Sequence, residues 1–128
     1  MNPLHPTIAG RARHRCEYCR APEVIFNFLF EVEHIIPLSR GGTDDSGNLA
    51  LSCRACNAHK AAHLTAYDEV TQQQVRLFRP RLDNWQENFA VEQVSGAILG
   101  LTAIGRATVT RLQFNTRTQQ NARWHWLR

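Results

Sequence analysis

Lysine is almost absent from this sequence. Lys60 is the only one, so arginine supplies fourteen of the fifteen basic side chains in the 128 residues. Acidic residues are absent after Glu92, whereas five arginines follow it. The planar guanidinium group binds phosphate oxygens with paired hydrogen bonds, which the point charge of lysine does not. With a net charge of +4, this pattern fits a nucleic-acid partner and fits a merely solvated basic surface equally well.

Long apolar runs are absent too. No stretch approaches the roughly 18 residues that a membrane span needs, and the first fifteen residues contain no apolar segment typical of a secretory signal. We therefore expect a cytoplasmic protein without a membrane partner. Thiols stay reduced in that compartment, so metal binding explains the four cysteines better than disulfides do. A chain of this length is expected to form a single domain overall.

The four cysteines form two pairs with the same internal spacing. Two residues separate Cys16 from Cys19, and two separate Cys53 from Cys56. This gap lets both sulfurs of a pair bind one ion at about 2.3 Å, and two pairs complete a tetrahedron. Four thiolates leave no open coordination position, so the predicted Zn²⁺ is structural. A redox pair and buried thiols without a ligand are the alternative interpretations.

Between the cysteine pairs the sequence predicts two strands and a helix. Alternating apolar residues over 24–36 indicate a strand that Pro37 ends, and a polar, glycine-rich turn follows. The segment LALSC, residues 49–53, indicates a second short strand. The alanine-rich segment after it predicts a helix that begins near Ser52 or Cys53. The predicted fold class is therefore α+β, with a core over residues 13–66.

The flanking segments give weaker signals. Residues 1–12 contain two prolines and a glycine without periodicity, and we predict a flexible arm. Residues 67–128 are predicted to be a C-terminal extension packed on the core. Its predicted elements are a strand at 75–78, a hairpin within 84–101, and helices capped by Thr102 and Thr116.

The stretch from Cys16 to Lys60 resembles the HNH endonuclease family in its zinc-bound, four-cysteine form. Outside the cysteines, the residues that carry the resemblance are His34, Pro37, Gly41, Gly42, Asn48, Leu49, Asn57 and Lys60. The third letter of the motif is Asn57 instead of histidine, so this is a His-Asn-Asn variant. The resemblance implies a ββα-metal (His-Me finger) core.

The resemblance also implies a reaction, the metal-dependent hydrolysis of DNA to a 5′ phosphate and a 3′ hydroxyl. His34 would be the general base, Glu33 and Asn57 would bind one divalent cation, and Asn48 would brace the loop and the histidine. A neutral imidazole is available near neutral pH to take a proton from water. Carboxylate and amide oxygens favour Mg²⁺ or Mn²⁺ at such a site. Two protein ligands leave positions for the phosphate and the leaving oxygen.

Strand geometry raises an objection to this assignment. Neighbouring residues of a flat strand point to opposite faces, so Glu33 and His34 share a site only if the strand bends there. Without a bend, Glu31 shares the face of Glu33. His59 and His63 are four residues apart on the predicted helix, but they lie about 200° around it from Asn57. DNA contact or solvation therefore explains these two histidines better than metal binding.

The predicted phosphate contacts are the cations inside the motif, Arg40, Arg54 and Lys60, although a solvated surface is an equal alternative for each. Prompt double-strand cleavage would need two nicking centres, so a homodimer is considered beside DNA as a partner. The competing functional hypothesis is a zinc-stapled nucleic-acid-binding module without catalysis, in which His34 is structural. A protein-interaction domain supported by zinc is the third.

Overall fold

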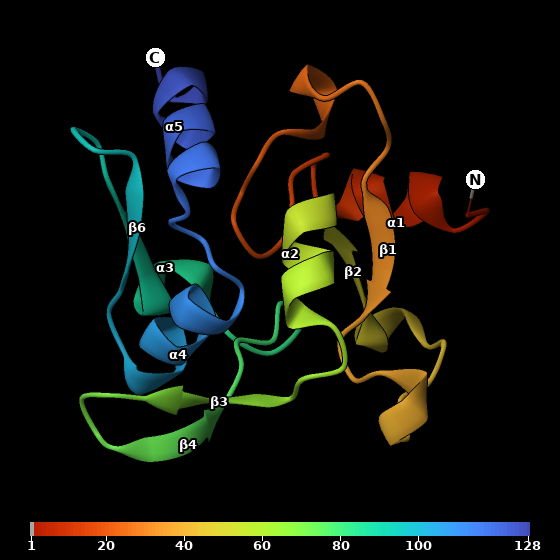
Figure 1. Cartoon of the computed structure of the whole chain (residues 1–128). Coiled ribbons are helices and arrows are strands. Elements are labelled where there is room, and N and C mark those ends of the chain that lie inside the picture. The colour runs from red at the N-terminus through yellow and green to blue at the C-terminus, as the bar shows by residue number, and fades with distance from the viewer. Residues whose placement is uncertain (1) are drawn as a thin grey trace. The chain divides into compact units, whose positions relative to one another are not determined.

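A computed structural model describes residues 2–128 (Figure 1), and Met1 lies outside the described residues. Short helices and three two-stranded antiparallel sheets make up this part of the chain. The chain divides into two compact units. Unit 1 extends to Ala62 and includes Arg79–Leu82, and unit 2 consists of His63–Phe78 and Asp83–Arg128. That these units behave as a single domain stays a prediction.

Unit 1 carries the paired strands between the cysteine pairs. Its elements are α1 (His5–Arg11), η1 (Glu23–Ile25), β1 (Glu31–His34), η2 (Leu38–Arg40), η3 (Ser46–Asn48), β2 (Leu49–Ser52) and α2 (Arg54–Lys60). β1 and β2 pair antiparallel, with Glu31 opposite Ser52 and His34 opposite Leu49. All four β2 residues are buried. α2 follows β2 directly, with Cys53 as its N-cap, as the sequence predicts.

The predicted flexible arm is wrong for residues 5–11, which form α1. Proline lies in its first turn, where the missing N–H costs no helical hydrogen bond. Ile8 and Ala9 are buried, and the Arg11 guanidinium donates hydrogen bonds to main-chain oxygens of Ser46 and Leu49. A two-turn helix is too short to be stable alone. The stability of α1 comes from packing against the rest of unit 1, and the hydrophobic periodicity of the sequence does not predict such packing.

The first predicted strand is also much shorter than expected. Within the described residues 24–36, only Glu31–His34 pairs as a strand, because its partner β2 is four residues long. The preceding aromatic residues group together instead. Phe26 packs its ring 5.7 Å from Phe28 and 5.1 Å from Phe30, measured between centroids. The alternation of apolar residues in the sequence predicts which side chains lie on the same side. It does not predict how many residues a second strand offers for pairing.

Unit 2 contains two hairpins and three helices among its described residues. They are β3 (Thr65–Asp68), β4 (Gln73–Arg76), α3 (Trp85–Asn88), β5 (Phe89–Glu92), β6 (Ala97–Gly100), α4 (Ala103–Arg111) and α5 (Arg117–Trp126). The predicted hairpin is confirmed as β5–β6. Both predicted caps are confirmed, since the Thr102 and Thr116 hydroxyls accept hydrogen bonds from the third residue beyond each. The strand predicted at 75–78 is found two residues earlier, as β4. The predicted core was expected to end at residue 66, which lies inside β3.

Three phenylalanines form the centre of unit 2. The ring of Phe89 lies 5.1 Å from that of Phe78 and 5.6 Å from that of Phe114. α4 packs closely against α3 and against the β5–β6 hairpin. A Cβ atom at Gly105 would overlap the main-chain oxygen of Asn88, the last residue of α3, and would lie 3.3 Å from Cα of Gly100 in β6. The glycine at this position therefore allows the helix to approach the hairpin.

Asp68 joins the β3–β4 hairpin to α4. Its carboxylate accepts two hydrogen bonds from Arg106, at 2.9 and 3.1 Å, and two from Thr71, at 2.7 and 3.0 Å. The Arg106 guanidinium, with help from Thr71, holds the pKa of this carboxyl well below its usual range. A carboxyl with a lowered folded-state pKa stabilises the fold above its unfolded pKa, about 3.9, and loses that contribution as the pH falls.

We therefore expect Asp68→Asn to destabilise unit 2 at neutral pH and to flatten the loss of stability below about pH 4. Thermal unfolding followed by tryptophan fluorescence measures this, because Trp85, Trp124 and Trp126 all lie in unit 2. Glu69→Gln, an exposed neighbour, is the matched control. Parallel pH profiles for Asp68→Asn and the wild-type chain would contradict the prediction.

Candidate metal centre and adjoining polar site

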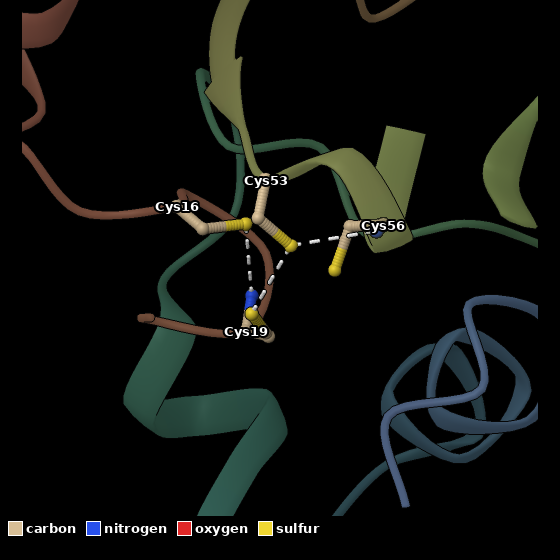
Figure 2. Close-up of side chains that lie close together, drawn as sticks. All are labelled: Cys16, Cys19, Cys53 and Cys56. Atoms are coloured by element: carbon tan, nitrogen blue, oxygen red, sulfur yellow. Dashed lines mark hydrogen bonds between the residues drawn. The ribbon is translucent and has the colours of Figure 1, made fainter. Parts of the chain in front are cut away.

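The four cysteines converge on one point, as the sequence predicts (Figure 2). Their sulfur atoms all lie within 4.8 Å of one another, and all four residues are buried. One pair lies in the turn between α1 and η1, and the other lies at the start of α2. Two segments far apart in the sequence are thereby held together.

Backbone hydrogen bonds shape each cysteine pair. The N–H of Cys19 donates to the sulfur of Cys16 at 3.5 Å, and the N–H of Cys56 donates to the sulfur of Cys53 at 3.4 Å. Arg20 adopts a left-handed conformation with φ 70°, which turns the chain back after the first pair. N–H groups directed at sulfur stabilise the thiolate form, which is the form that binds a metal.

The electrostatics of this cluster require a cation if all four thiols are to ionise. Burial opposes ionisation of Cys16, but hydrogen bonds from the other three cysteines lower its pKa overall. Contact with Cys16 in turn raises the pKa of Cys19 and Cys56. Without a cation, the cluster thus favours one ionised thiol and disfavours the ionisation of a second. Tetrahedral coordination by four thiolates removes this conflict, so the donor set fits a structural Zn²⁺.

His34 is the last residue of β1 and is partly exposed. Its Nε2 lies 2.7 Å from Oδ1 of Asp44, an exposed residue of the following loop. A carboxylate at this distance orients the imidazole and selects its tautomer. Sequence reasoning missed Asp44, because an acid in a turn-rich segment looks like any other loop residue. The only available signal was its position within the motif.

Asn48 fixes the loop that follows His34. Its Oδ1 accepts a hydrogen bond from the N–H of Ile36 at 2.8 Å, and its Nδ2 donates to the oxygens of Ile36 and Thr43, at 3.0 and 2.8 Å. The loop passes so close that a Cβ atom at Gly42 would overlap the oxygen of Ile36. These bonds brace the loop, as the family resemblance implies, and they run to Ile36 and Thr43 instead of to the His34 side chain.

Glu33 lies inside unit 1, only 5% exposed. Its carboxylate accepts hydrogen bonds from the Tyr18 hydroxyl at 2.5 Å and from Nζ of Lys60 at 2.7 Å. Burial raises the pKa of this carboxyl, although Lys60 and Tyr18 oppose the rise. β1 pairs in regular register from Glu31 to His34, so Glu33 and His34 point to opposite faces. The bend that a shared catalytic metal site requires does not form over these described residues.

Asn57 instead meets Glu31, the acid two residues earlier. Its Nδ2 donates a hydrogen bond to the Glu31 carboxylate, and both residues are partly exposed. The amide and the carboxylate come from α2 and from the start of β1. This juxtaposition follows from strand alternation, because Glu31 and Glu33 share the face of β1 that α2 covers.

Residues 16–63 match the family model of the HNH endonucleases. This segment, here called the HNH domain, is similar to the HNH endonucleases. The matched residues begin at the first cysteine and include all four, together with His34, Asn48 and Asn57. Comparisons with curated proteins and with solved structures gave no match. Among the described residues, none of the helices is long and apolar enough to span a bilayer.

One predicted DNA contact of the HNH domain, Lys60, is buried. Lys60 is only 1% exposed and donates hydrogen bonds to Glu33 and, at 2.8 Å, to the main-chain oxygen of Ile35. A buried lysine needs a charged partner. For Lys60, on α2, this partner is Glu33, on β1. Arg40 and Arg54 are exposed, and their contact with DNA stays a prediction.

The histidines of the chain also differ from expectation. α2 ends at Lys60, so His63 lies beyond the helix and the four-residue helical pair with His59 does not form. His5 is buried, and its Nε2 lies 2.7 Å from the Glu23 carboxylate. Nδ1 of His14 lies 2.9 Å from the same carboxylate. Sequence spacing gave no indication of this cluster.

Proposed function

We propose that the HNH domain is a metal-dependent endonuclease that hydrolyses DNA phosphodiester bonds. The family match over residues 16–63 carries this proposal. It is supported by a histidine oriented by Asp44 at the end of β1, next to a loop that Asn48 braces. In this proposal β1, β2 and α2 are the ββα-metal core, and a structural Zn²⁺ bound by the four cysteines clamps it.

The proposed general base is His34. When Nε2 carries the proton and donates a hydrogen bond to the Asp44 carboxylate, the lone pair of the imidazole is on Nδ1. Nδ1 can then take a proton from the water that attacks the phosphate. Protonation gives an imidazolium that the Asp44 carboxylate stabilises. Asp44 is a positioning residue in this scheme, because it acts through His34.

The divalent cation of this proposal would be Mg²⁺ or Mn²⁺, which would neutralise charge on the phosphate and on the leaving oxygen. The amide of Asn57 and the adjacent carboxylate of Glu31 provide oxygen donors of the kind these cations prefer. Glu33, the ligand that the family resemblance implies, would first have to leave Tyr18 and Lys60. We therefore assign the carboxylate ligand to Glu31.

The decisive experiment is plasmid cleavage with Mg²⁺ or Mn²⁺. We expect the wild-type chain to nick or cut supercoiled DNA and His34→Ala to be slower by at least about a hundredfold, the usual contribution of a general base. His63→Ala, at an exposed position, is the matched control, and the zinc content of each variant reports folding. Unchanged cleavage by His34→Ala would rule out this assignment.

The second candidate is a zinc-stapled DNA-binding module without catalysis. The burial of Glu33 favours it, because the expected metal ligand is engaged elsewhere. A titration with Mn²⁺ separates the two candidates. Mn²⁺ binding that disappears in Asn57→Ala while zinc is retained supports the enzyme. DNA binding that weakens with salt, without any cleavage, supports the module.

A further inference from the structure

We infer that residues 24–29, here called the apolar loop, and the pocket beside them bind an unstacked nucleobase of the DNA strand. This inference rests on the proposed function of the HNH domain. It goes beyond that function by assigning the substrate class, namely DNA with an unpaired base next to the cleavage point.

The apolar loop exposes side chains that a folded protein normally buries. Val24 is 85% exposed, Ile25 58% and Leu29 48%. These residues lie within six positions of each other and next to the partly exposed rings of Phe26 and Phe28. Contiguous apolar exposure of this kind marks a binding surface, whereas isolated exposed residues need no explanation.

A pocket of about 660 Å³ opens beside this loop. Val24, Phe26, Phe28 and Leu29 supply its apolar walls. Pockets that hold a flat heterocycle combine apolar walls with a few fixed polar groups, and enzymes that flip a base stack it between such side chains.

The polar groups of the pocket are His5, His14, Glu23 and Asn27. The buried Glu23 carboxylate fixes both imidazoles and also accepts the N–H of Phe30 at 2.7 Å. His14 is exposed and contacts Glu23 through Nδ1. Its Nε2 can therefore hydrogen-bond to the edge of a base.

A continuous set of contacts connects the apolar loop to the proposed cleavage site. The Arg54 guanidinium lies 4.2 Å from the centroid of the Phe28 ring. Nε of Arg54 lies 4.0 Å from the Glu31 carboxylate, which accepts the hydrogen bond from Asn57. A strand whose phosphate lies at Glu31 and Asn57 therefore has bases within reach of Phe28.

The charge of unit 1 favours nucleic acid over an apolar protein partner. Its described residues contain six acidic side chains, of which Glu17, Glu23 and Glu33 are buried. Of its nine basic side chains, Lys60 alone is buried in the described part. The surface of unit 1 is consequently more basic than its composition indicates, as a polyanion requires, and Arg54 brings one of these cations to the apolar loop.

The test compares the full zinc-loaded chain with the triple variant Val24→Asn, Ile25→Asn and Leu29→Asn. The probe is DNA carrying 2-aminopurine either in a single-stranded gap or fully paired, in buffer without Mg²⁺ or Mn²⁺. We expect the wild-type chain to change the fluorescence of the gapped base. The variant should lose this change, and its Kd for gapped DNA should rise about tenfold, which corresponds to losing the burial of about one aliphatic side chain.

Val94→Asn, an exposed apolar residue of the β5–β6 turn, is the control and should leave Kd unchanged. Because Ile25 and Leu29 are only about half exposed, the zinc content of the triple variant is measured to confirm that it folds. Equal Kd and fluorescence for variant and wild type would overturn the inference. A variant that alters only self-association would also overturn it, assigning the loop to a second copy of the chain. Base binding without any cleavage would leave the inference standing and defeat the nuclease proposal.

Discussion

Removing the metal from the cysteine cluster should unfold unit 1. Structural zinc contributes about 10–16 kcal/mol in zinc-finger peptides, which equals or exceeds the whole stability of a typical domain, about 5–15 kcal/mol. The elements of unit 1 have little stability of their own. β1 and β2 are four residues long and α2 is seven, well below the length at which an isolated helix or hairpin is stable in water.

Chelation of zinc, or the substitution Cys53→Ser, tests this expectation. Cys53 is both a sulfur ligand and the N-cap of α2, whose sulfur accepts the N–H of Cys56, so its loss affects the helix as well as the metal. Far-UV circular dichroism should decrease, and the zinc content should fall. Because the three tryptophans lie in unit 2, their fluorescence should change less than the dichroism.

Ala55→Ser is the matched control, because it changes a residue between the two ligands of α2 without removing a sulfur. Zinc should also be released as the pH falls, since protons compete with the metal for thiolates. A metal-free chain that keeps its native dichroism and unfolds cooperatively would show that the cysteines are not a structural metal site.

The features that could be predicted from the sequence are those fixed by near neighbours. The cysteine pairs depend on a two-residue gap, and the caps Thr102 and Thr116 each bond to a residue three positions away. Hydrophobic alternation likewise located the β5–β6 hairpin, whose strands are connected by a short turn. Such signals are independent of the rest of the fold.

The missed features depend on residues far apart in the sequence. Lys60 is 27 positions from Glu33, and His5 is 18 positions from Glu23. In each pair, a charged or polar side chain looks exposed until its distant partner is known. The missed orientation of Glu33 is a partial exception, because strand alternation already indicated that Glu33 and His34 point to opposite faces. The length of β1 could not be predicted, since it is set by how many residues β2 offers for pairing.

The buried pair of Glu33 and Lys60 carries the second large expected effect. Lys60→Met removes the cation and leaves the carboxylate inside unit 1 with the Tyr18 hydroxyl as its remaining donor. Breaking a buried ion pair by removing one partner typically costs about 3–5 kcal/mol of folding free energy. Denaturant unfolding of the zinc-loaded chain, followed by circular dichroism, should show a loss of this size.

Two further variants isolate the cause. Glu33→Gln combined with Lys60→Met removes the uncompensated charge, so it should recover much of the stability. Arg40→Met removes an exposed cation of the same domain and should change stability by no more than about 0.5 kcal/mol. If Lys60→Met instead matched Arg40→Met in stability and weakened only DNA binding, Lys60 would be a phosphate contact after all.

The pH dependence of Lys60→Met gives an independent check. Burial already raises the pKa of Glu33, and Lys60 is the main influence that lowers it, so the variant should have a still higher pKa. A carboxyl whose folded-state pKa is raised favours the folded state when it is protonated and opposes it when it is ionised. The stability deficit of Lys60→Met should therefore shrink as the pH falls, over the range in which zinc remains bound. A deficit that grew as the pH fell would mean that the carboxylate of Glu33 is stabilised by something other than Lys60.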